Sequence, residues 1–205
     1  MFIRYTLLAD GSSDGVLLPI IRWVIESNFP EIEMEGQLAG PGIPPAKAGL
    51  PKRAQAATAL YECDVLFVHR DAERDGYALR RAQLDEELVA LRQSWVAVIP
   101  VRMTEAWLLG NERAIRTAAG NPNGNTRLTI PLRQRWETLP DPKADLFRLL
   151  HTAANRPKRR PINEGQCRMR VAELTTDYSH LRELPSFDAF EADVIRVFNE
   201  IRDDA

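Results

Sequence analysis

The chain has 205 residues, of which 44% are hydrophobic and 27% are charged, and its formal net charge at pH 7 is −2. This composition is typical of one globular domain, or of one domain with an appendage, and it excludes a disordered chain or a multi-domain assembly. No apolar run approaches the roughly 18 residues that a membrane-spanning helix needs, so we expect a soluble protein without a membrane partner.

The N-terminus and the cysteines indicate the compartment. Residues 1–10 show no apolar segment followed by a small-residue cleavage site, so we expect no signal peptide. The two cysteines, Cys63 and Cys167, are too few and too distant in sequence for a disulfide framework or a four-thiolate zinc site. We therefore expect a cytoplasmic protein with free thiols.

The first 101 residues alternate short apolar runs with amphipathic segments. Repeated alternation of this kind is typical of an α/β domain, here a mainly parallel four-stranded sheet flanked by helices. The expected strands are 2–9, 32–38, 64–69 and 95–101, and the expected helices are 16–25, 52–61 and 77–92, the last with Leu79, Leu84, Leu88 and Leu91 on one stripe.

The rest of the chain is predicted to be mainly helical. Helices are expected over 112–119, 145–154, 169–175 and 187–201, with Ser186 as the cap of the last one. We therefore divide the chain into an α/β core, residues 1–110, and a helical extension, residues 111–205.

The near-neutral net charge conceals a local imbalance. Residues 111–170 carry thirteen basic and five acidic side chains, whereas residues 171–205 carry three basic and nine acidic ones. A strongly basic segment favours contact with nucleic acid phosphates, with Trp136 as a stacking face, although the two segments could instead pair with each other. The nucleic-acid-binding candidates are Arg127, Arg133, Arg135, Arg156, Lys158, Arg159, Arg160, Arg168 and Arg170.

Acidic residues follow three of the four expected strands. Asp10 follows the first strand, Asp71, Glu73 and Asp75 follow the third, and Glu105 follows the fourth. Strand ends of a parallel sheet converge on one crevice, where clustered carboxylates either hold a divalent cation or splay apart. Oxygen ligands favour Mg²⁺ or Mn²⁺ over zinc. Any one acid alone is more often a turn residue that accepts backbone N–H bonds.

Two motifs carry a resemblance to a known family. Asp10-Gly11-Ser12-Ser13-Asp14 after the first strand and Asp71-Ala72-Glu73 after the third resemble the Toprim domain of topoisomerases, bacterial primases and OLD-type nucleases, which has a Rossmann-like sheet. The segment from Arg102 to Trp107 is similar to an Arg-x-x-Glu-x-Trp segment of bacterial Toprim-like families, which are often encoded beside ABC-type ATPases in loci attributed to phage defence.

The resemblance implies Mg²⁺-dependent cleavage or transfer of a phosphodiester in DNA or RNA, and an ABC-type ATPase as a partner. It implies that Asp10, Asp71 and Glu73 bind the metal, that these three and Glu105 are catalytic, and that other residues support them. The supporting residues are Gly11, Ser13, Asp14, His69, Asp75 and Arg102.

Two alternatives stay open. Toprim domains usually have Glu where this chain has Asp10, and Asp-x-Asp where it has Asp71-Ala72-Glu73, so the site could bind without cutting. A receiver-like regulatory module also gathers aspartates at strand ends, but no lysine follows a late strand here. A calcium loop starting at Asp71 is disfavoured because Ala82 stands at its twelfth position.

Overall fold

The computed structural model describes residues 1–156 and 161–204, so the candidates Lys158, Arg159 and Arg160 lie outside the described residues. Its centre is a four-stranded parallel sheet in the order β2-β1-β3-β4. The strands are β1 (Phe2–Leu8), β2 (Glu33–Leu38), β3 (Val65–His69) and β4 (Trp95–Val98). The predicted α/β class, with a parallel four-stranded sheet and a helical C-terminal region, is confirmed.

Alternating side chains divide the apolar residues of the sheet between two cores. Tyr5, Leu7 and Phe67 face one core, whereas Leu66 and Val68 face the other. Both faces are covered, which is why the strands are nearly continuous apolar runs. The fourth strand ends at Val98 rather than at Val101 as expected, since Pro100 has no N–H to donate to a neighbouring strand.

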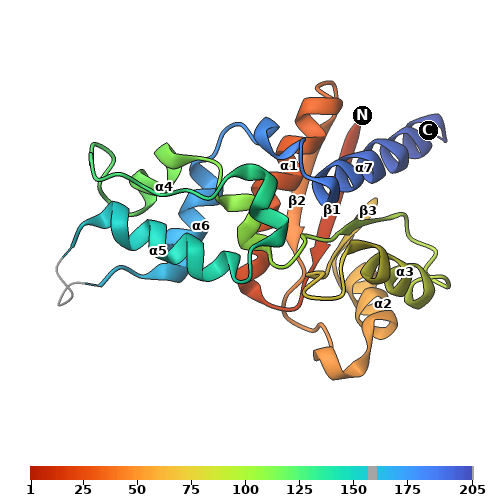
Figure 1. Cartoon of the computed structure of the whole chain (residues 1–205). Coiled ribbons are helices and arrows are strands. Elements are labelled where there is room, and N and C mark those ends of the chain that lie inside the picture. Colours follow the sequence, from red (N-terminus) through yellow and green to blue (C-terminus); the bar gives the residue numbers. More distant parts are fainter. Residues whose placement is uncertain (157–160, 205) are drawn as a thin grey trace.

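Two helices cover each face of the sheet (Figure 1). On one face lie α1 (Leu17–Asn28) and α7 (Pro185–Asp203), and on the other α2 (Leu50–Leu60) and α3 (Tyr77–Glu87). The sequence prediction extended α3 to residue 92 and placed Leu79 on its apolar stripe, but the helix ends at Glu87. Leu79 is 51% exposed, whereas Leu84 and Leu88 are buried beside the strands.

The first three helices of the extension lie together on the left of Figure 1, away from the sheet. They are α4 (Glu112–Ala118), α5 (Pro142–Ala154) and α6 (Glu164–Leu174). Short 3-10 segments accompany the helices: η1 (Ser12–Val16), η2 (Ala46–Ala48), η3 (Thr104–Leu108), η4 (Arg133–Thr138) and η5 (Ser179–Leu181).

The extension and the sheet share one apolar core. Trp107 of η3 is fully buried and packs on Phe187 and Phe190 of α7, and Phe190 in turn contacts Phe67 of β3. The chain from residue 111 therefore leaves the sheet through α4, α5 and α6 and returns to it through α7.

The start of α7 differs from the sequence prediction. Ser186 was expected to cap this helix, but it lies in the first turn, while Leu184 is the N-cap residue. The Glu137 carboxylate of η4 accepts the Ser186 backbone N–H at 3.0 Å. A carboxylate from a neighbouring segment thus satisfies a free N–H group that a cap side chain would otherwise satisfy.

Within the described residues, no helix combines the length and the apolar character that crossing a bilayer requires.

Candidate functional site

A cavity of about 790 Å³ lies at the carboxyl ends of β1, β3 and β4, between the sheet and the helical extension. Crevices at this edge of a parallel sheet are the usual ligand sites of α/β folds. Its charged lining residues are Asp14, Asp71, Glu73, Arg74, Asp75, Arg102, Glu105, Asp141, Lys143 and Arg168. The remaining lining residues are Ser13, Met103, Pro140, Phe147, Gly165 and Met169.

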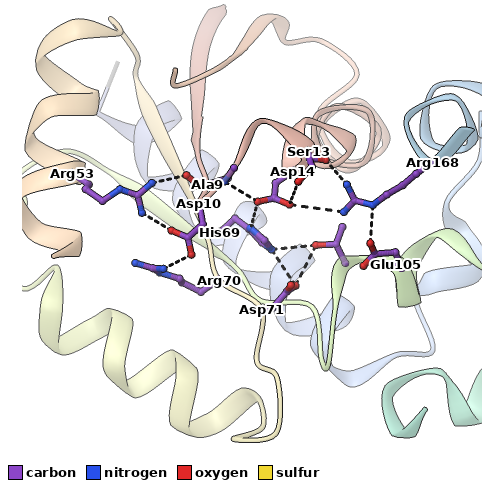
Figure 2. A network of polar contacts seen from close by, with 12 residues as sticks. Ala9, Asp10, Ser13, Asp14, Arg53, His69, Arg70, Asp71, Glu105 and Arg168 are labelled. Atoms are coloured by element: carbon purple, nitrogen blue, oxygen red, sulfur yellow. Dashed lines mark hydrogen bonds and ion pairs between the residues drawn. The ribbon is translucent and has the colours of Figure 1, made fainter. Parts of the chain in front are cut away.

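His69, the last residue of β3, lies between two aspartates of this cavity (Figure 2). Its Nε2 is 3.2 Å from Asp71 Oδ1, and its Nδ1 is 3.6 Å from Asp14 Oδ2, an ion-pair distance too long for a direct hydrogen bond. The Thr104 hydroxyl lies 3.2 Å from both His69 Nε2 and Asp71 Oδ1. The imidazole ring therefore lies between the carboxylates of Asp14 and Asp71.

The electrostatics favour a charged imidazole. Burial alone would lower the pKa of His69, but the hydrogen bond with Asp71 and the negative charges of Asp14 and Asp71 outweigh it and raise this pKa from 6.5 to about 9. Burial alone would raise the pKa of Asp14, but the positive charge of His69, the Gly11 backbone N–H and the charge of Arg168 together outweigh burial and lower this pKa. At neutral pH the group is an imidazolium between two carboxylates.

Glu105 and Arg168 form a buried ion pair at the wall of the cavity, shown at the right of Figure 2. Arg168 Nε is 2.9 Å from Glu105 Oε1, and both residues are buried. The Arg168 guanidinium also donates to the Ser13 carbonyl and lies 3.8 Å from Asp14 Oδ1. Arg168 of α6 therefore connects the extension to the turn after β1 and neutralises Glu105.

Asp10 does not line this cavity. Its carboxylate accepts from Arg53 at 2.5 Å and from Arg70, as the left of Figure 2 shows. It lines a separate, smaller cavity of about 260 Å³ together with Gly11, Ser12 and Arg53. Asp14, expected only as a supporting residue, is the acid of the first motif that shares a cavity with Asp71.

Backbone strain is concentrated at the same cavity. Glu73 has φ of 50° and Arg102 has φ of 67°, in the left-handed region that L residues rarely adopt. The two residues are joined by an isolated antiparallel β-bridge, and both line the cavity. Such strain persists only where the surroundings impose it, and it is common at binding and catalytic sites.

The carboxylates suit a weakly held Mg²⁺ better than a closed metal centre. In the described part of the chain, no group of three or more His, Cys, Asp or Glu side chains is arranged to hold a metal ion. Mg²⁺ is commonly held by one or two carboxylates, several waters and the phosphates of the substrate. The Asp71 carboxylate, with Oδ1 engaged by His69 and Thr104 and its side chain 32% exposed to the cavity, fits that mode, with Asp14 and Glu73 nearby.

The basic segment is less available for binding than the sequence predicted. Trp136 is 3% exposed and donates its indole N–H to the Pro131 carbonyl, so the expectation of a stacking face there is wrong. Arg133 forms an ion pair with Glu183 at 2.7 Å, as the alternative of pairing with the acidic tail predicted. Arg135 and Arg156 are exposed.

Arg53, Lys143 and Phe147 were not predicted as part of a site, and Arg168 was expected only as a phosphate-binding candidate of the basic segment. Arg53 and Arg168 had a signal in the sequence, because each interrupts the apolar stripe of its own helix: Arg53 with Leu50 and Ala57, and Arg168 with Val171. A charged residue on an apolar stripe is buried and needs a partner. Lys143 and Phe147 had no such signal in the sequence. A lysine in the first turn of a helix and a phenylalanine on an amphipathic helix are both common and do not indicate a site.

The sequence matches no protein-family model, and neither a curated protein nor a solved structure matches it. Function must therefore be inferred from the chemistry of the cavity.

Proposed function

We propose that the protein is a divalent-metal-dependent phosphodiesterase that acts on nucleic acid. One observation carries the proposal: a single cavity at the carboxyl edge of the sheet combines acids from three strand ends with cations that have no acidic partner. Asp14, Asp71 and Glu105 supply the acids. Arg74, Arg102 and Lys143 supply the cations, and within the described ranges none of the three forms an ion pair with an acidic side chain.

The residues have distinct roles in this proposal. Asp71 would hold Mg²⁺ or Mn²⁺ together with waters and the phosphates of the substrate, with Asp14 and Glu73 lining the same cavity, while His69 and Thr104 fix the orientation of Asp71. A bound divalent cation lowers the pKa of a coordinated water and neutralises charge on phosphoryl oxygens. Arg74, Arg102 and Lys143 bind and orient the phosphates, as cations do at phosphoryl-transfer sites.

Incubation of the pure protein with labelled DNA and RNA strands, in Mg²⁺, Mn²⁺ or EDTA, tests the proposal. We expect cleavage with either metal and none in EDTA. Asp71→Asn and Asp14→Asn should each lower the cleavage rate by about 100-fold or more. Asp203→Asn, at an exposed carboxylate near the end of α7, is the matched control and should leave the rate unchanged. If neither nucleic acid is cut, the catalytic proposal is wrong.

Binding without cleavage is the second candidate, and the geometry of two acids favours it. Asp10 is held by two arginines outside the cavity, and Glu105 is neutralised by Arg168. Both were expected to be catalytic, and each is paired with arginine side chains. A protein that binds strands in Mg²⁺ but leaves them intact would support this candidate. The ATPase partner and the phage-defence role stay predictions of the resemblance.

A further inference from the structure

The cavity has a second wall of different chemistry, supplied by the helical extension. Phe147 of α5 is half-buried, packed against the core on one side and lining the cavity, with Met169 of α6 and Met103 beside it in the lining. Lys143 lies one turn before Phe147, with its Nζ 5.8 Å from the centroid of the aromatic ring. An aromatic and thioether surface next to a cation therefore faces a wall of carboxylates.

This combination suits a nucleotide unit better than a bare phosphate. A phosphate needs only cations, whereas an apolar surface with an aromatic ring offers a face to a flat heterocycle. Stacking of a base on an aromatic side chain contributes about 1–3 kcal/mol and tolerates any base, because every base has a π-face. Lys143 beside the ring, and Arg74 and Arg102 across the cavity, can hold the flanking phosphates.

The size of the cavity favours a single strand over a duplex. A cavity of about 790 Å³ is in the range that accommodates a small ligand, not the width of a double helix. Bases of a duplex are stacked on each other, and each would have to leave the stack before it could meet Phe147.

We propose that the cavity takes single-stranded nucleic acid, with one base stacked on Phe147 and its phosphates at Lys143, Arg74 and Arg102. This inference rests on the proposed function, since both use the same cavity. It places the stacking side chain at Phe147 of α5, 11 residues after the buried Trp136.

Binding is measured separately from cleavage. Phosphorothioate strands that resist cleavage are titrated with the full chain in Mg²⁺ and again in EDTA, followed by fluorescence anisotropy. The probes are a short oligothymidine, the same length of blunt duplex, and an abasic strand that carries the phosphates without bases. We expect the oligothymidine to bind most tightly, and the abasic strand to bind weakly even to the unmodified protein.

Variants at one position separate stacking from packing. Phe147→Leu keeps the apolar contact with the core and removes the aromatic face, and it should weaken oligothymidine binding by about 5- to 150-fold. Phe147→Tyr should bind oligothymidine with an affinity within about twofold of the unmodified protein, since its ring still stacks.

Lys143→Gln should reduce the slope of log K against log salt by about one. Lys52→Gln, on the exposed start of α2, is the matched control.

Two outcomes would overturn the inference: equal binding of oligothymidine and abasic strand, or a Phe147→Leu variant that binds oligothymidine as tightly as the unmodified protein. The abasic comparison needs no variant, so a misfolded mutant cannot hide the answer. If the protein binds strands in a base-dependent way but does not cleave them, the catalytic proposal alone is contradicted. If the protein cleaves strands and neither the Phe147 variants nor removal of the bases changes the cleavage rate, this inference alone is contradicted.

Discussion

Buried charges are the main feature of this protein at the scale of single residues. His69, Glu105 and Arg168 are each less than 10% exposed, and each lies against a group of opposite charge at the cavity. Burying an ion costs several kcal/mol that only close partners can offset, so such groups depend on one another. The positions of the Asp14 and Asp71 carboxylates consequently depend on His69 and Arg168.

Arg168→Met should destabilise the protein by about 3–5 kcal/mol, because it leaves Glu105 buried and without its cation. The double variant Glu105→Gln/Arg168→Met removes both charges and should recover most of that loss. Urea denaturation followed by circular dichroism measures both. A double variant no more stable than Arg168→Met would mean that the guanidinium acts through its bond to the Ser13 carbonyl rather than through Glu105.

His180 gives the fold a dependence on pH. Its ring packs against Trp136 and Tyr178, burial lowers its pKa, and the positive charge of Arg133 lowers it further against the opposing effect of Asp177. The unfolded state, with a pKa near 6.5, therefore binds the proton more readily than the native state. The stability that the neutral ring contributes is present above about pH 6.5 and is lost as pH falls through the lower, native pKa.

Between pH 7 and pH 5.5, the melting temperature of the unmodified protein should fall more than that of His180→Gln, because glutamine takes up no proton. Carboxylates that titrate in the same range affect both proteins equally. The difference between the two falls in melting temperature therefore reports the contribution of His180. Differential scanning calorimetry at the two pH values measures it. An equal fall in melting temperature for both proteins would show that the His180 ring is no more difficult to protonate in the native state than in the unfolded chain.

At the scale of secondary structure elements, charged residues on apolar stripes connect helices to their neighbours. Asp193 lies on the buried face of α7 between Phe190 and Val197 and is 7% exposed. Its carboxylate accepts the Ala97 backbone N–H of β4 at 3.1 Å and the Arg81 guanidinium of α3 at 2.8 Å. The helix thereby covers part of the edge of β4, an edge strand whose N–H groups would otherwise be open to another chain.

Asp193→Ala should cost about 1–3 kcal/mol, chiefly because the Ala97 N–H becomes buried without an acceptor. Arg81 and Arg196 are partly exposed, so their charges can return to water and add little. The free energy of unfolding in urea measures the loss. Glu200→Ala, which removes an exposed partner of Arg196 on the same helix, serves as the control and should stay within about 0.5 kcal/mol.

For the whole molecule, the cavity exists only because two parts of the chain close on it. The strand ends supply the carboxylates, and α5 and α6 supply Phe147, Lys143 and Arg168. Within the residues that the structure describes, the ion pair between Arg133 and Glu183 joins the basic and acidic segments of the extension, so part of the positive charge of residues 111–170 serves the fold. Arg135 and Arg156 of the same stretch are exposed to solvent.

The double charge reversal Arg159→Glu/Arg160→Glu should weaken binding of single-stranded nucleic acid and flatten its salt dependence, since each lost phosphate contact lowers the slope by about one. Arg133→Gln removes a cation that already has an intramolecular partner, so it should change stability and leave the salt slope as it is. Titrations over a series of salt concentrations measure both. An unchanged slope in the double variant would assign residues 159 and 160 no part in binding.

The strands, the helices and the edge at which acids gather could be predicted from the sequence. Those features follow from apolar periodicity and from the convergence of parallel strand ends, which are local or topological rules. The order of Asp71, Glu73 and Glu105 along the chain was enough to place all three at this cavity.

Tertiary structure alone decided which charges meet. Asp10 and Asp14 are four residues apart on one turn, yet one is held by Arg53 and Arg70 and the other faces His69. Trp136, expected as an exposed stacking face, is part of the core, and Phe147, for which no sequence signal existed, lines the cavity. The physical reason is that electrostatic partners and packing neighbours come from distant segments, and a burial pattern states only that a residue is inside, not what it touches there.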